Sequence, residues 1–149
     1  MIYTNHIVTY LNFNYSKEYL LLGLKSGYEI YKIEPFKLKK SNKLNKSISI
    51  IDILENTNII VFTGGDENGY CKKNNLILYD DNNKKELIRV ECESNILNLK
   101  ITNKYRITLL IDKCIIYDLD LKMIQIINTG LNRHGLVSIN YNKDICKYS

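Results

Sequence analysis

Short runs of β-branched and aromatic residues recur along the whole chain, and each run is bounded by Asn, Asp, Gly or Lys. This pattern is typical of many short strands, whereas the spacing of apolar residues that marks an amphipathic helix is nearly absent. We therefore predict an all-β protein. The expected strands are Ile7–Phe13, Tyr19–Leu24, Tyr28–Ile33, Ile48–Ile53, Ile59–Thr63, Asn75–Tyr79, Glu86–Glu91, Ile96–Ile101, Arg106–Ile111, Cys114–Asp118 and Met123–Ile127.

Three of these strands share a motif in which an apolar run ends in a tyrosine that precedes a polar turn. The motif occurs at Tyr28–Ile33, Leu76–Asp81 and Cys114–Leu119. Its tyrosines, Tyr31, Tyr79 and Tyr117, are 48 and 38 residues apart (79 − 31 and 117 − 79). A period of about 40–45 residues in a chain of strands is that of four-stranded propeller blades. We predict a partial β-propeller of about three WD-like antiparallel blades, at approximately 1–47, 48–92 and 93–149 of a single domain 1–149.

Tyr79-Asp80 and Tyr117-Asp118 stand where the third strand of a WD-repeat blade ends in Trp-Asp. In such blades the aromatic ring packs between neighbouring sheets, and a tyrosine can do the same with its hydroxyl at the rim. We expect a packing role for these tyrosines and not a catalytic one. A blade buries its faces only against its neighbours, so three blades form an arc with two exposed faces. The chain is then a fragment, pairs with another molecule, or is a poorly folding remnant.

Composition and charge narrow the function only a little. The chain is 45% hydrophobic and 25% charged, and its net charge of +5 implies mild attraction to anionic partners at most. Basic residues concentrate in a segment that we expect to be an inter-strand loop, at Lys37, Lys39, Lys40, Lys43 and Lys46. This segment lacks the interleaved aromatic residues that stack on bases, so no nucleic-acid partner is expected.

The cysteines and histidines do not form a metal site or a disulfide framework. Cys71, Cys92, Cys114 and Cys146 contain no C-x-x-C pair, and His6 and His134 lie at opposite ends of the chain. Cys114 lies inside an apolar run, which predicts a buried thiol and favours a reducing, cytoplasmic compartment. Neither a signal peptide nor an apolar stretch of about 20 residues is present, so we expect no membrane insertion. We expect no metal and no cofactor.

Several segments, in order, resemble the opening blades of the PROPPIN (WIPI) family. Asn58–Gly65 followed by Asn74–Asp81 is similar to the family's second-blade pattern, in which a double glycine precedes a strand ending in W-D-D. The first and third blades add further matches. Across the three blades the chain departs from the family pattern at Tyr15, Thr63 and Tyr79, where the family more often has Asp, a small apolar residue and Trp, respectively. The matching segments are Leu11–Tyr15, Leu20–Leu24, Gly27–Tyr31, Asn95–Lys100, Asn103–Arg106, Ile115–Tyr117 and Thr129–Ile139.

The resemblance implies a seven-bladed, phosphoinositide-binding propeller of autophagic or endosomal membranes. The family binds phosphatidylinositol 3-phosphate and its 3,5-bisphosphate through an F-R-R-G motif, whose two arginines clamp phosphate. This chain contains only Arg89, Arg106 and Arg133, with no adjacent pair. Phosphoinositide binding is therefore expected only of further blades, if they exist, and a peripheral place on such membranes is implied in the same way.

The resemblance also implies a docking site for autophagy-type protein partners in the cleft between the second and third blades. Lys104 and Arg106 match the family's basic turn there and are our candidate partner-binding residues. The residues that we expect to mark the blade structure itself are Tyr31, Gly64, Gly65, Tyr79, Asp80, Asp81, Tyr117 and Asp118.

Enzymatic chemistry has little support. The sequence has no G-x-S-x-G, H-E-x-x-H or G-x-x-x-x-G-K-[ST] motif, and we interpret Gly64-Gly65-Asp66 as a strand-to-loop turn, not a phosphate cradle, because no helix is expected to follow it. We predict a non-catalytic scaffold. The alternative hypothesis is a self-contained short β protein that binds other proteins through its exposed blade edges. A continuation carrying further blades and F-R-R-G would favour the first, and a stop after Ser149 would favour the second or a decayed gene.

Overall fold

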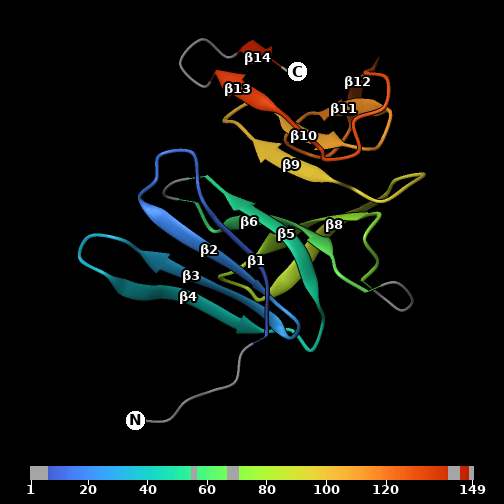
Figure 1. Cartoon of the computed structure of the whole chain (residues 1–149). Coiled ribbons are helices and arrows are strands. Elements are labelled where there is room, and N and C mark those ends of the chain that lie inside the picture. Colours follow the sequence, from blue (N-terminus) through green and yellow to red (C-terminus); the bar gives the residue numbers. More distant parts are fainter. Residues whose placement is uncertain (1–6, 55–56, 67–70, 141–144, 148–149) are drawn as a thin grey trace.

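The computed structural model describes residues 7–54, 57–66, 71–140 and 145–147. Three four-stranded antiparallel sheets follow one another along the chain, and the described residues include no helix (Figure 1). Within each sheet the strands lie side by side in chain order. The predicted all-β class and partial propeller are confirmed.

We call the three sheets blade 1, blade 2 and blade 3. Blade 1 consists of β1 (Val8–Phe13), β2 (Tyr19–Leu24), β3 (Gly27–Lys32) and β4 (Lys37–Lys43). Blade 2 consists of β5 (Ile48–Ile53), β6 (Ile59–Gly64), β7 (Asn75–Asp80) and β8 (Lys85–Glu91). Blade 3 consists of β9 (Asn98–Ile101), β10 (Arg106–Leu109), β11 (Lys113–Tyr117) and β12 (Met123–Asn128). A separate hairpin of β13 (Ser138–Asn140) and β14 (Ile145–Lys147) follows.

The three blades repeat one another in strand register as well as in strand number. Each third strand pairs with its fourth strand through a β-bulge immediately before the motif tyrosine, at Ile30/Tyr31, Leu78/Tyr79 and Ile116/Tyr117. A bulge places one additional residue in one strand of the pair and increases the local twist. The additional residue is Lys39 in β4, Leu87 in β8 and Ile124 in β12, so these positions are structurally equivalent.

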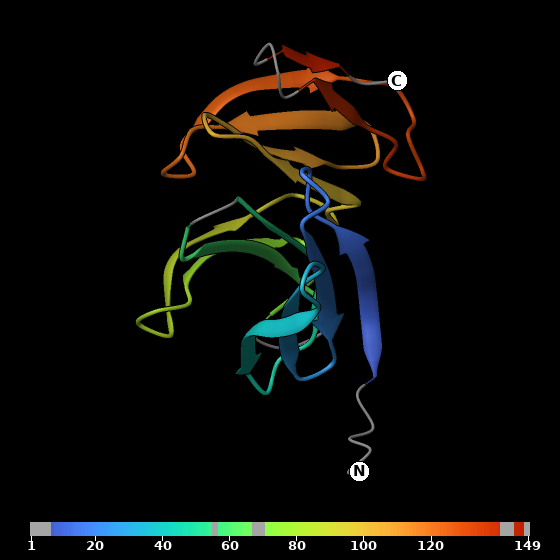
Figure 2. The ribbon, with the colours of Figure 1, turned by 90° about the vertical axis from the view of Figure 1, so that its left-hand side faces the viewer.

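The core lies between the blades, as expected for units that bury their faces on their neighbours. One apolar cluster joins blades 1 and 2 around Tyr28, Ile51 and Ile60, and a second joins blades 2 and 3 around Val61 and Leu99. The innermost strands β1, β5 and β9 are in contact, and Figure 2 shows the three sheets stacked along the arc. We call the two contact regions junction 1–2 and junction 2–3.

The two ends of the arc are covered differently. On the far face of blade 3, Ile107, Leu109 and Cys114 form a small cluster that Val137 and Ile139 cover. On β1 of blade 1, Leu11 and Phe13 are exposed. The side chain of Cys114 is buried, which confirms the predicted burial of this thiol.

The interpretation of Lys37–Lys46 as a loop was wrong, because Lys37–Lys43 forms strand β4. An outer strand is largely open to solvent and needs little apolar alternation, so the lysine-rich sequence of β4 does not show the pattern that predicts a strand. The short strands β13 and β14 were not predicted either. The other strands were predicted within one or two residues. The largest differences, of two residues each, are at β9, which begins at Asn98 instead of Ile96, and at β10, which ends at Leu109 instead of Ile111.

Candidate partner-docking site

The motif tyrosines occupy equivalent backbone positions but pack differently. Tyr79 and Tyr117 are buried, whereas Tyr31 is half-buried and stacks on Phe36 with 5.3 Å between ring centroids. Its hydroxyl donates to Glu29 Oε2 at 2.6 Å, and this bond raises the pKa of Tyr31 to about 12. In blade 1 the ring that lies in junction 1–2 is instead that of Tyr28.

The aspartates that follow Tyr79 and Tyr117 hold the turn into the outer strand. Asp80 Oδ1 accepts from the main-chain N–H of Asn82 at 2.9 Å and of Asn83 at 3.2 Å. Asp118 Oδ1 accepts in the same way from Asp120 and Lys122, each at 2.9 Å. Side chains of this length readily accept bonds from backbone amides two residues on, which fixes a tight turn. The hydrogen bonds of Asp80 hold its pKa below the ordinary value.

Gly64 and Gly65 are required by close backbone approach at the end of β6. A Cβ built on Gly64 would lie 2.1 Å from the carbonyl oxygen of Cys71, and one on Gly65 would lie 2.4 Å from Ser47 Oγ. Gly65 N–H also donates to the Ser47 carbonyl at 2.8 Å. These contacts give the double glycine a structural role in the blade 2 turn.

Asp81 is buried and links blade 2 to blade 1. The Tyr28 hydroxyl donates to Asp81 Oδ1, and the Lys84 ammonium lies 2.9 Å from the same oxygen. Lys40 Nζ lies 3.8 Å from Asp81 Oδ2. Asn42 Nδ2 donates to the Tyr79 hydroxyl at 2.7 Å across the same junction. Burial, followed by the bond to Asp81, raises the pKa of Tyr28, so its phenol stays protonated.

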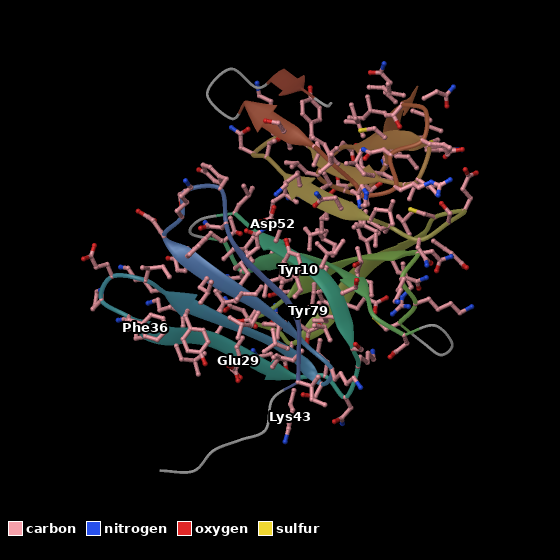
Figure 3. All side chains as sticks on the ribbon, in the orientation of Figure 1. Tyr10, Glu29, Phe36, Lys43, Asp52 and Tyr79 are labelled. Carbon is pink, nitrogen blue, oxygen red and sulfur yellow. The ribbon has the colours of Figure 1, made fainter. Side chains whose placement is uncertain are left out.

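Asp52 is the corresponding buried carboxylate of junction 2–3, and it lies at the end of β5 that approaches blade 3 (Figure 3). Oδ1 accepts from the Ile53 N–H at 2.9 Å, and Oδ2 accepts from the Ile101 N–H of blade 3 at 3.3 Å. Burial raises the pKa of Asp52 to about 7, although the positive charges of Lys100 and Arg106 act against that rise. Burial also raises the pKa of Tyr10, to which the Asp52 charge adds.

The structure separates the two predicted docking residues. Arg106 is 6% exposed, and its Nη1 donates to the Thr102 carbonyl at 2.8 Å, so its guanidinium lies against its own turn instead of facing a partner. Arg106 Nε is buried without a hydrogen-bond partner among the described residues, and burial lowers the pKa of Arg106. Lys104 is exposed on the β9–β10 turn. A docking role for Lys104 and Arg106 stays a prediction.

A cavity of about 270 Å³ opens where the inner strands end. Asp52 and Lys100 line it from β5 and β9, and Lys17 lines it from the β1–β2 turn. The strand β9 runs directly from Lys100 into the turn that carries Lys104. This end of the molecule therefore combines a small polar cavity with three lysines on neighbouring elements. The remaining lining residues are Tyr10, Asn12, Phe13, Asn14, Tyr15, Val137, Ser138 and Ile139.

The sequence analysis did not single out Asp52, Lys100 or Tyr28. Asp52 carried a usable signal, since it is a lone acid inside the apolar strand Ile48–Ile53, and such an acid needs a partner when buried. Tyr28 is separated from Asp81 by 53 residues, and no local pattern links them. Groups of His, Cys, Asp or Glu that could hold a metal ion do not occur in the described part of the chain. No helix long and apolar enough to span a membrane occurs among those residues.

Comparison with known proteins gives related sequences, although no family model matches the chain. Autophagy-related protein 18 of Komagataella pastoris is 25% identical over 138 residues, covering 92% of this chain and 25% of the relative. Autophagy-related protein 18 of Debaryomyces hansenii is 29% identical, and the match covers 89% of this chain and 24% of the relative. SVP1-like protein 2 of Neurospora crassa is 27% identical, and the match covers 72% of this chain and 25% of the relative. The chain spans about a quarter of the length of these relatives.

Solved structures share the fold. Hsv2 of Kluyveromyces marxianus superposes with a TM-score of 0.76 at 21% identity, covering 90% of this chain and 42% of that one. KlAtg21 in complex with the coiled coil of AgAtg16 gives a TM-score of 0.67 at 18% identity, covering 82% and 39%. The part of this chain that superposes therefore corresponds to less than half of each of these two chains.

Proposed function

We propose that this chain, whose homologues are the autophagy-related protein 18 and SVP1-like propellers, is a non-catalytic scaffold that docks a partner protein at junction 2–3. The resemblance to the PROPPIN family predicted from the sequence is confirmed by these homologues. The docking role, the absence of catalysis and a place in the cytoplasm or on autophagic or endosomal membranes are our proposals.

The observation that carries the proposal is that Lys17 and Lys100 line the cavity at the inner-strand ends, while Lys104 is exposed on the turn that directly follows β9. Three positive side chains on one end favour a partner that presents acidic side chains, because complementary charge speeds and orients association. The coiled coil that accompanies KlAtg21 supports a helical protein partner for a propeller of this fold.

Unlike partner docking, phosphoinositide binding is not proposed for these 149 residues. The 149 residues contain no F-R-R-G and no adjacent arginines, so they lack the bidentate phosphate clamp of the family. We propose that vesicles containing phosphatidylinositol 3-phosphate do not retain this chain in a flotation assay, and that lipid binding requires further blades.

The test is titration of the purified chain with the AgAtg16 coiled coil, using a charge reversal on the β9–β10 turn. Lys104→Glu is expected to weaken binding about tenfold, equivalent to roughly 1.4 kcal/mol. The matched control is Lys25→Glu on the exposed β2–β3 turn, which lies at the opposite end of its blade and is expected to leave the affinity unchanged. Equal losses for the two variants, or no binding by the unmodified chain, would contradict the proposal.

A further inference from the structure

The outer strands of the three blades differ in how they protect their open edges. β4, β8 and β12 each pair with one neighbour only, so one side of each strand has main-chain groups open to solvent. Proteins usually guard such edges with charged side chains, particularly lysine, because an open edge can pair with another strand. The shared bulge aligns six positions of each outer strand. These are Leu38–Lys43 in β4, Glu86–Glu91 in β8 and Met123–Asn128 in β12.

Charges protect the first two edges but not the third. β4 carries Lys39, Lys40 and Lys43 at these positions, and β8 carries Glu86, Arg89 and Glu91. The corresponding residues of β12 are Met-Ile-Gln-Ile-Ile-Asn, which include no charge. The side chains of Met123, Ile124 and Ile126 are nevertheless 59%, 54% and 49% exposed. β12 is thus an apolar and unguarded outer edge.

The main chain of β12 is also oriented for pairing. Thr129 N–H donates to the Asp112 carbonyl at 3.0 Å, which extends the β11–β12 ladder by one pair. Hydrogen-bonded and non-hydrogen-bonded pairs alternate along an antiparallel ladder. Because Thr129 bonds to β11, every second residue before it, Ile127 and then Gln125, also bonds to β11. The main-chain N–H and C=O groups of Ile126 and Asn128 therefore point toward the open edge.

We propose that β12 pairs antiparallel with β12 of a second copy of this chain, with Ile126 at the two-fold axis, so that the two blades 3 form one continuous eight-stranded sheet. A second copy is the fitting occupant because an uncharged edge meets itself without repulsion, whereas pairing β4 with itself would bring lysines together. Neighbouring blades pack on the faces of a sheet, so this outer edge stays accessible however many blades accompany it. The inference is independent of the docking function proposed above.

The first test is the molar mass of the purified chain by sedimentation equilibrium, over a concentration series up to roughly 1 mM because interfaces below about 1,200 Å² are often weak. The mass is expected to rise from 17.4 kDa toward twice that value. Ile124→Lys places on β12 the charge that Lys39 provides on β4, and it is expected to hold the chain at the monomer mass. The matched control, Leu87→Lys, changes the equivalent exposed position of β8 and is expected to dimerise normally.

The second test does not depend on a charged substitution. Hydrogen-bonded residues across an antiparallel pair have Cα atoms about 5.5 Å apart, which suits a disulfide. Ile126→Cys is therefore expected to give a covalent dimer on oxidation, whereas Ser41→Cys, at the equivalent exposed position of β4, is expected to give none beyond the background from the native cysteines. A constant mass of 17.4 kDa, dimerisation by Ile124→Lys, or equal cross-linking of the two cysteine variants would overturn the proposal.

Discussion

Each of the two blade junctions buries one aspartate side chain, Asp81 at junction 1–2 and Asp52 at junction 2–3. Asp81 accepts a bond from the Tyr28 hydroxyl and has the Lys84 ammonium 2.9 Å away. Asp52 is held by two main-chain N–H groups, and the nearby Arg106 guanidinium leaves its Nε without a partner among the described residues. A buried charge needs both a counter-charge and hydrogen bonds to be stable. Junction 1–2 therefore joins the blades firmly, while junction 2–3 keeps polar groups incompletely satisfied.

The incompletely satisfied polar groups of junction 2–3 bear on where a partner binds. Under-satisfied buried polar groups concentrate at binding and catalytic sites, since a partner can complete their interactions. The polar cavity is lined by β1 and the β1–β2 turn as well as by Asp52 and Lys100, and on the blade 3 side strand β9 continues from Lys100 into the turn of Lys104. We infer that junction 1–2 serves as the rigid support and junction 2–3 as the docking site.

The largest expected effect is on the pH dependence of stability, at Asp52. Because the pKa of Asp52 is about 7 in the folded chain and 3.8 in its ordinary state, the folded carboxyl binds a proton more tightly. Its contribution to stability is complete below about pH 4 and is lost as the pH rises through 7. Between pH 5 and pH 8, wild type should lose roughly 2–4 kcal/mol of unfolding free energy relative to Asp52→Asn.

Urea denaturation of both proteins at pH 5 and pH 8 measures this difference. The unfolding free energies of Asp52→Asn and wild type should be closest at pH 5, with the variant gaining relative stability at pH 8. An unchanged difference between the two pH values would show that Asp52 does not titrate in this window, and the contrast between the junctions would lose its electrostatic basis.

A smaller effect is expected from removing one hydroxyl at each junction. Tyr28→Phe leaves the buried Asp81 without its tyrosine donor, which should lower the free energy of unfolding by about 1–3 kcal/mol. At Tyr117 the hydroxyl contacts Cys92 Sγ at 3.4 Å, and sulfur is a weak hydrogen-bonding partner, so Tyr117→Phe should lower it by less than about 1 kcal/mol. Chemical denaturation at pH 7 compares them, and a larger loss for Tyr117→Phe would reverse our ranking of the junctions.

A similarly small effect is expected within a blade, where neither junction is involved. Asp118→Ala removes the two bonds that hold the β11–β12 turn and should lower the free energy of unfolding by about 1 kcal/mol, in the range of lost backbone caps. Asp120→Ala changes the exposed neighbour in the same turn and should change it by less than about 0.5 kcal/mol. Thermal melting of the two variants is sufficient, and equal shifts would argue against the capping role.

The repeat was predictable from the sequence because the tyrosine motif and the turn aspartate that follows Tyr79 and Tyr117 are local features. Asp80 and Asp118 act within four residues of themselves. Strand β4 was missed because solvent contact removes the apolar alternation by which strands are recognised.

The site was less predictable, because its contacts cross between blades. The bond from Tyr28 to Asp81 spans 53 residues, and that from Ile101 to Asp52 spans 49, so both depend on how the blades pack. The basic pair was identified from its match to the family's basic turn, but that match did not indicate that Arg106 turns back onto Thr102 while Lys104 stays exposed.

The most direct test of the account is amide hydrogen exchange of the chain with and without the AgAtg16 coiled coil. Docking at junction 2–3 predicts slower exchange on binding in the segment from Ile101 to Arg106, with no change in β3 and β4 of blade 1. Protection confined to blade 1, or none in the β9–β10 turn at saturating coiled coil, would contradict the assignment of junction 2–3 as the docking site.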